Sequence, residues 1–198
     1  MECPVGVMPE LKSVPAKVLL LGDPGLRRKC EPVDDPSNAD YQYNRDRLHA
    51  TLEAFRAEHG FGRAISAPQI GVPQRFIAVN LGDGPFTMTN PEITWCSPET
   101  FTMWDDCMSF PFLLVRVRRH SSISVRYLDD DANIRVMDRL DQATSELLQH
   151  EIDHLDGVLA VDHALDADAI VSREVFEETP DWFADKVDYV ITPTVDRL

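Results

Sequence analysis

The chain has 198 residues, with 19 basic against 34 acidic side chains and a formal net charge of −15. Its 43% hydrophobic and 27% charged residues are typical of a globular protein and exclude a coiled coil or a disordered chain. The negative charge makes nucleic acid and anionic membranes poor partners, because both repel an acidic surface. The length favours one domain with one core.

The start of the chain predicts an extended arm on a cytoplasmic protein. Residues 1–16 contain three prolines and little periodicity, and they lack the basic-then-apolar order of a signal peptide. No apolar run approaches the roughly 20 residues that cross a membrane. Four widely spaced cysteines without a C-x-x-C pair predict free thiols or one metal ligand, not a disulfide framework.

The first half of the domain, which we expect at residues 17–165, predicts a helix between strands. Residues 18–21 are typical of a short buried strand, and residues 75–79 of a second one. Between them, residues 44–59 carry a helical apolar stripe that ends before Gly60. The small side chains of residues 60–71 suit close backbone approach better than core filling.

The second half predicts an antiparallel sheet followed by a helix, and therefore an α+β fold. The β-rich segments are residues 112–119, 123–128 and 134–137, with a turn at 129–133. Asp141 can cap a helix that runs to about residue 156 before Gly157, and residues 158–161 predict a final strand. Residues 166–198 hold nine acidic and three basic side chains, with a possible helix at 169–178.

The predicted helix at residues 141–156 carries the strongest functional signal. His150, Glu151 and His154 form an H-E-x-x-H pattern, in which the four-residue spacing puts both imidazoles on one face. Two such imidazoles can share one metal ion, and a catalytic site would add a third protein ligand and a water. The alternatives are core histidines paired with backbone or carboxylate groups, or a solvated helical turn.

The third ligand stays open on spacing alone. Cys107, His120, His163 and nearby acids are candidates, and Cys107 can equally be a small buried hydrophobic residue. In a zinc protease of the thermolysin kind the third ligand would lie downstream. His163, nine residues past His154, fits that scheme poorly.

Three segments resemble the motifs of one known family. Residues 62–71 (GRAISAPQIG), 105–109 (DDCMS) and 149–157 (QHEIDHLDG) stand in the order and approximate spacing of the G-x-G-x-A-A-x-Q, E-G-C-x-S and H-E-x-D-H motifs of peptide deformylases. Residues 18–28 and 125–129 are also similar to family segments. The resemblance covers roughly residues 16–163.

The resemblance implies antiparallel β-sheets around a central metal-binding helix. It also implies a metal-dependent amide hydrolase that removes the N-formyl group from the N-terminal methionine of nascent polypeptides. Cys107, His150 and His154 would bind one divalent metal with a water, usually Fe(II) in cells and replaceable by zinc, nickel or cobalt. Glu151 would act as general base and then acid, while the Gln69 side chain and the Met108 N–H would donate to the oxyanion.

The departures from the family motifs lie at positions that we expect to bind substrate: Arg63, Ala64, Asp105 and Asp106. The resemblance places the first motif at the family's methionine pocket. Arg63 would favour a polar or acidic group there if it pointed inward, but we expect it to point to solvent. Asp105 can pair with Arg119. Asp106 either adds negative charge beside Cys107 or holds a left-handed turn.

These departures leave two alternatives open, a deformylase-like hydrolase with another N-acyl substrate and a metal-binding relative without catalysis. Intact Gln69 and Glu151 count against the second alternative. Formylated peptide N-termini are the expected partner, without direct nucleic acid or membrane binding. The acidic tail disfavours docking on ribosomal RNA, although Trp182 and Phe183 hint at another contact.

Overall fold

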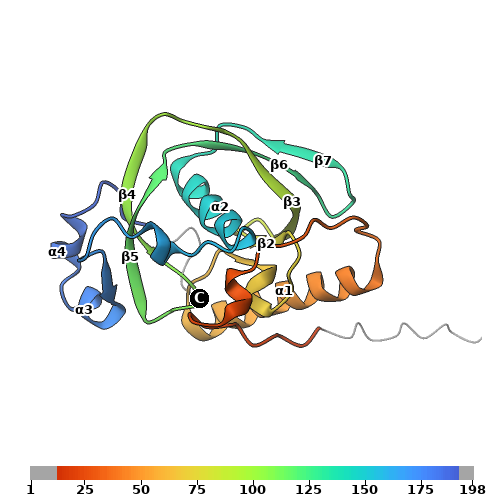
Figure 1. Ribbon diagram of the computed structural model, residues 1–198, viewed down its shortest axis with the longest axis horizontal. Coiled ribbons are helices and arrows are strands. Elements are labelled where there is room, and N and C mark those ends of the chain that lie inside the picture. The colour runs from red at the N-terminus through yellow and green to blue at the C-terminus, as the bar shows by residue number, and fades with distance from the viewer. Residues whose placement is uncertain (1–12, 192–198) are drawn as a thin grey trace, which may run out of the picture.

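The computed structural model describes residues 13–191 and shows two antiparallel β-sheets that enclose one helix (Figure 1). The first sheet has the strand order β1-β2-β3-β6-β7 and the second β4-β5-β8. The strands are β1 (Ala64–Ser66), β2 (Phe76–Asn80), β3 (Pro85–Cys96), β4 (Thr100–Asp106), β5 (Leu113–His120), β6 (Ile123–Leu128), β7 (Ile134–Met137) and β8 (Ile170–Ser172). The helices are α1 (Ala39–His59), α2 (Gln142–Leu155), α3 (Arg173–Glu178) and α4 (Pro180–Ala184). This arrangement confirms the expected α+β class.

Helix α2 lies between the two sheets and is buried on nearly every side (Figure 1). The Asp141 carboxylate accepts a hydrogen bond from the N–H of Thr144 and begins the helix, as predicted. At the other end Gly157 has a φ of 75°, and a Cβ there would lie 2.7 Å from the carbonyl oxygen of Arg27. Only glycine fits that end without displacing the backbone.

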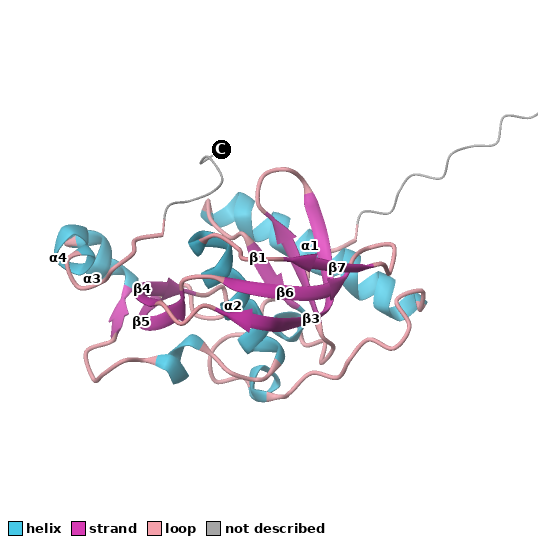
Figure 2. Ribbon diagram, turned by 90° about the horizontal axis from the view of Figure 1, so that it is seen from above, coloured by secondary structure: helices cyan, strands magenta, loops and turns pink. Residues whose placement is uncertain are grey.

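The five-stranded sheet divides the core into two layers because its side chains alternate between its faces. On one face Ala64, Ile77 and Val79 pack against α2. On the other face Ile65, Phe76 and Ala78 pack against α1, which covers the sheet from outside (Figure 2). Helix α1 begins five residues earlier than predicted, because Asn38 accepts hydrogen bonds from two N–H groups of the first turn.

Three predicted elements differ in the structure. Residues 18–21 form no strand: they are only partly buried, and their N–H groups at Leu19 and Leu21 donate to the carbonyl oxygens of Gln69 and Ser109. The strand at residues 158–161 is replaced by the 3-10 helix Ala160–His163. Residues 64–70, expected not to fill the core, are all buried.

Residues 166–191 pack onto the three-stranded sheet at the left of Figure 2. The predicted helix at 169–178 begins as β8, which pairs with β5, and only then becomes α3. Phe183 is buried, and its carbonyl accepts a hydrogen bond of 2.9 Å from the indole of Trp104, whereas Trp182 is exposed. The domain boundary after residue 165 stays a prediction, although this segment completes a sheet.

Several sequence expectations concern the termini and the thiols. Cys30, Cys96 and Cys107 are free, as predicted, while Cys3 lies outside the described residues. Most of the expected arm at residues 1–16 also lies outside them, and residues 13–16 have no regular structure. Within residues 13–191 we find no helix long and apolar enough to cross a membrane.

Candidate active site

One cysteine and two histidines converge inside the protein. Cys107 follows β4, and His150 and His154 lie one turn apart on α2, where all three are buried. The Cys107 sulfur and the Nε2 atom of His150 each lie 3.2 Å from Nε2 of His154. Their potential ligand atoms all fall within 4.8 Å of one another. A thiolate and two imidazoles at this spacing fit a single first-row divalent metal.

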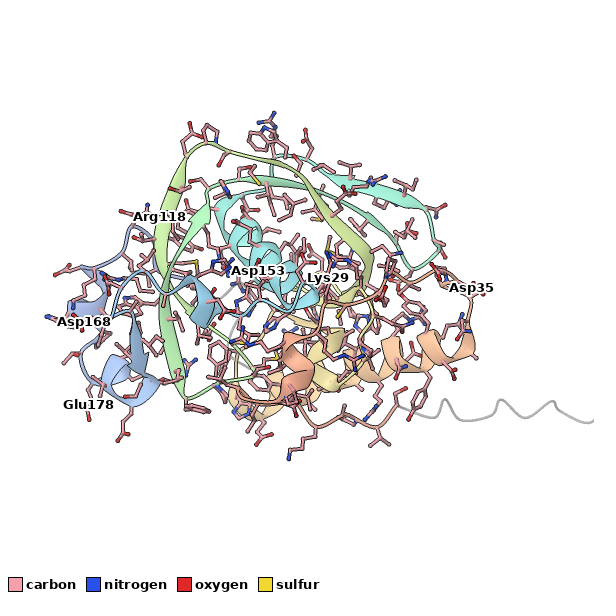
Figure 3. The ribbon with its side chains drawn as sticks, viewed as in Figure 1. Lys29, Asp35, Arg118, Asp153, Asp168 and Glu178 are labelled. Carbon is pink, nitrogen blue, oxygen red and sulfur yellow. The ribbon has the colours of Figure 1, made fainter. Side chains whose placement is uncertain are left out.

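Asp105 supports the cluster from behind. Its carboxylate accepts a hydrogen bond of 3.0 Å from Nδ1 of His150 and pairs at 3.0 Å with Arg119, which also binds Asp153. A proton on Nδ1 leaves Nε2 free for a metal. Figure 3 labels Asp153 on α2, at the outer end of this network. The pairing of Asp105 with Arg119 is confirmed. Asp105 is only 3% exposed, and its contact with substrate stays a prediction.

Burial and neighbouring charged groups shift the pKa values of Asp105, His150 and His154. Burial opposes ionisation of Asp105, but His150 and Arg119 outweigh it and lower the pKa of Asp105. Burial likewise disfavours a charged His150, but Asp105 and the Cys107 sulfur outweigh it and hold the pKa of His150 well above its ordinary value. For His154, burial and the neighbouring His150 lower the pKa well below its ordinary value. Asp105 therefore carries the negative charge behind the ligands.

The other candidate third ligands have different partners. His163 contacts the Asp153 carboxylate at 3.1 Å, and Nδ1 of His120 lies 2.7 Å from the carbonyl oxygen of Ser97. Among residues 13–191, neither belongs to a group able to hold a metal. The scheme of a zinc protease with a downstream third ligand therefore has no geometric support.

Glu151 lies buried beside the cluster, where Ser66 holds it. The Ser66 hydroxyl lies 2.8 Å from the backbone oxygen of Glu151 and also contacts the Glu151 carboxylate. The hydroxyl has one proton, so at any moment it donates either to the backbone oxygen or to the carboxylate. Burial raises the pKa of Glu151. The Ser66 donor favours the ionised form of Glu151 and so opposes the effect of burial, which suits a group that both takes and releases a proton.

The Gln69 amide is oriented towards the cysteine. Its oxygen accepts a hydrogen bond of 2.9 Å from the N–H of Ser66. Its nitrogen therefore faces the Cys107 sulfur at 3.7 Å and the Ser109 hydroxyl at 3.2 Å. The Met108 N–H has no hydrogen-bond partner among the described residues. Both donors can serve an oxyanion beside the cluster.

Two supporting residues escaped the sequence reasoning. Ser66 was visible only as a departure from a motif alanine, and Ser109 only as the motif serine. Neither position indicates from sequence alone that one serine contacts Glu151 and the other Gln69.

The structure explains why residue 62 is a glycine. Its φ is 114°, and a Cβ there would lie 2.6 Å from the methyl carbon of Met108. Here the first motif packs directly on the second.

Arg63 turns inward, so its expected solvent exposure is wrong. The guanidinium pairs with Glu146 on α2 and donates a hydrogen bond of 2.9 Å to the carbonyl oxygen of Ala143. The Arg63 side chain is 12% exposed. Ala64 is buried against α2 and lines the core. The buried carboxylate of Glu146, 83 residues away in the chain, is what draws Arg63 inward.

Asp106 is not in a left-handed turn, so that hypothesis is wrong. It ends β4 opposite Leu114 and has no positive φ. Its carboxylate pairs at 3.0 Å with Arg173 at the start of α3. Arg173 also donates to the carbonyl oxygen of Pro111 and stacks over the ring of Phe61, 4.9 Å from its centre. The segment after residue 166 thus contacts the second motif at Asp106 and the residue just before the first motif, Phe61.

Comparison with known proteins agrees with this geometry. Residues 15–169 match the family model described as polypeptide deformylase. The peptide deformylase of Thermotoga neapolitana is 35% identical over 163 residues, covering 80% of this chain and 92% of that protein. The crystal structure of the Thermotoga maritima peptide deformylase superimposes with a TM-score of 0.70 at 31% identity, covering 77% of this chain and 99% of that one.

A further solved structure, the actinonin-bound class I type b peptide deformylase of Acinetobacter baumannii, has a TM-score of 0.67 at 29% identity. It covers 76% of this chain and 99% of its own. The matched region includes the three motifs that bring Gln69, Cys107 and the two α2 histidines together. The chain therefore belongs to the polypeptide deformylase family.

Proposed function

We propose that this protein is a metal-dependent peptide deformylase that removes the N-formyl group from the N-terminal methionine of nascent polypeptides. The observation that carries the proposal is the buried group of Cys107, His150 and His154 with Glu151 and Gln69 beside it, in a chain of this family. The reaction breaks the formyl C–N bond, adds water across it, and releases formate and a free amine.

Cys107, His150 and His154 would hold one divalent ion, which supplies Lewis acidity and an activated water when bound. From the family resemblance we propose Fe(II) in cells. Zinc, nickel or cobalt can replace it, because a thiolate and two imidazoles suit several first-row metals. Asp105 keeps His150 in the tautomer that presents Nε2 to the ion.

Glu151 takes the proton from the attacking water and gives it to the leaving amine nitrogen. Its burial and raised pKa suit a group that must both accept and release a proton. The Gln69 side-chain nitrogen and the Met108 N–H donate to the oxyanion that develops from the formyl oxygen. Ser66 orients both Glu151 and Gln69.

The substrate would be an extended peptide with a formylated N-terminus. Strand β1 stands at the end of its sheet, so its outer edge offers backbone groups to an added strand beside Glu151. We expect this action in the cytoplasm, without direct binding of nucleic acid or membrane. Ribosome docking through the acidic tail is not expected, because its charge has the wrong sign for RNA.

The test combines metal analysis with formate release from formyl-Met peptides, on protein purified without oxygen. We expect about one metal per chain and rapid formate release. Glu151→Ala should keep the metal and abolish turnover. Metal without formate release would reject this substrate and favour another N-acyl group, and a cellular function that survives Glu151→Ala would indicate a binding protein.

A further inference from the structure

Arg173 reaches the candidate active site from a segment outside the family match, which ends before α3. Its guanidinium pairs with Asp106 at 3.0 Å and donates a hydrogen bond of 2.6 Å to the carbonyl oxygen of Pro111. The same group lies over the ring of Phe61, 4.9 Å from its centre. The N–H of Arg173 donates a further hydrogen bond of 2.9 Å to the carbonyl oxygen of Phe112. These contacts fix the guanidinium at the second motif and beside the residue that precedes the first.

The carboxylate that Arg173 pairs with stands next to a metal ligand. Asp106 immediately precedes Cys107 and occupies the glycine position of the E-G-C-x-S motif. Because successive residues of a strand point to opposite faces, Asp105 faces His150 on the inside, whereas the 29% exposed side chain of Asp106 faces Arg173. In the described part of the chain, Arg173 provides the one ion pair of Asp106.

The charge of Asp106 also acts across the site. Burial disfavours the charged form of Arg63, but Glu146 outweighs it and Asp106 adds to the effect, so the pKa of Arg63 is raised. Arg63 immediately precedes β1, whose outer edge is the proposed binding place of the peptide. A peptide along that edge therefore passes through the electric field of Asp106. An unpaired carboxylate at this position would repel an acidic peptide and the oxyanion that forms in the reaction.

We propose that Arg173 is a positioning residue of the deformylase reaction, which neutralises Asp106 and so lets the site accept acidic residues after the formylated methionine. Charge compensation by Arg173 thus makes up for the loss of a glycine, which would bring no charge to this position. Arg173 acts through Asp106 and need not touch the substrate. The inference rests on the proposed function and extends it to the charge of the residues that follow methionine.

The test compares two peptide amides, formyl-Met-Asp-Asp-NH₂ and formyl-Met-Asn-Asn-NH₂, which are nearly equal in shape and differ by two charges. The measured quantity is the ratio of their kcat/KM values with metal-loaded protein, because a general loss of structure lowers both values alike. Arg173→Met leaves the carboxylate unpaired and should lower the Asp-to-Asn ratio about tenfold at low salt. Adding Asp106→Asn to this variant should restore the ratio to within about threefold of wild type.

Arg116→Met is the matched control. Arg116 also ties the C-terminal segment to the three-stranded sheet, because it pairs with Asp166 and donates a hydrogen bond of 3.5 Å to the carbonyl oxygen of Lys186. Its carboxylate partner is therefore not Asp106, and the variant should keep the wild-type ratio. Arg173→Lys keeps the charge and should also stay near that ratio. An equal fall in Arg116→Met would show that the ratio follows the attachment of the segment, and would overturn the inference.

The remaining outcomes separate the inference from the function on which it rests. Metal-loaded wild type that releases formate from neither peptide refutes the proposed function. Formate release with an unchanged ratio in Arg173→Met, or a double variant that does not restore the ratio, overturns the inference alone. If Arg173→Met fails to fold, Asp106→Asn by itself replaces it. This change leaves Arg173 as an unpaired cation and should raise the Asp-to-Asn ratio, and an unchanged ratio there overturns the inference.

Discussion

Replacing Ser66 by alanine tests whether one hydroxyl holds the general base. Ser66 is fully buried, and its hydroxyl contacts the carboxylate and the backbone oxygen of Glu151. A hydrogen bond to a charged group contributes about 1.5–3 kcal/mol. We therefore expect Ser66→Ala to destabilise the protein by about 2 kcal/mol and, if the same energy is lost in the transition state, to lower kcat about 30-fold.

The pH profile separates this role from a general loss of stability. A donor to the carboxylate favours its ionised form, so removing the donor raises the pKa of Glu151 further. The acid limb of the kcat profile should then move to higher pH, while KM changes little. Ser66→Thr should restore most of the rate, because it keeps the hydroxyl.

Ser124→Ala is the matched control, since Ser124 is also buried and donates a hydrogen bond of 2.6 Å to Asp138, away from the site. We expect it to lower stability without moving the acid limb. A Ser66→Ala protein with kcat within twofold of wild type and an unmoved acid limb would refute the reasoning.

Four further predictions follow from the same contacts. Cys107→Ser should collapse metal content in elemental analysis, and retained stoichiometric metal would reject the ligand assignment. Asp105→Asn removes the charged partner of His150 and should weaken metal binding about 10–100-fold in chelator competition; unchanged affinity would contradict its supporting role. Burial raises the pKa of Glu146 to about 7 against the opposing effect of Arg63, so its contribution to stability is present below its ordinary value of 4.5 and lost as pH rises through 7; Glu146→Gln should flatten that loss in urea unfolding between pH 5 and 8, and parallel curves would disprove it. Phe183→Ala should cost about 3–5 kcal/mol if residues 166–191 unfold with the domain, whereas an unchanged main transition would show that they unfold separately.

Elements with local signals were predictable from the sequence. Helix α2 begins after Asp141 and ends before Gly157, as predicted, and strands β6 and β7 have the predicted limits. Helix caps and hydrophobic periodicity depend on residues only a few positions apart, so the limits of these elements can be predicted without knowing the rest of the fold. The same holds for the two α2 histidines, whose separation is set by the helix itself. The helix and its ligand pair were therefore determined locally.

Only the tertiary structure decided which partners distant residues meet. Residues 18–21 have the composition of a strand, but their N–H groups donate to the two motif loops instead of a sheet. Arg63 turns inward because Glu146 lies 83 residues away across the core, and Asp106 pairs with Arg173, 67 residues further along. Ser66 likewise meets Glu151 over a separation of 85 residues. Because folding alone creates such contacts, the sequence identified the metal-binding motif, whereas the structure determined which polar side chains lie beside it.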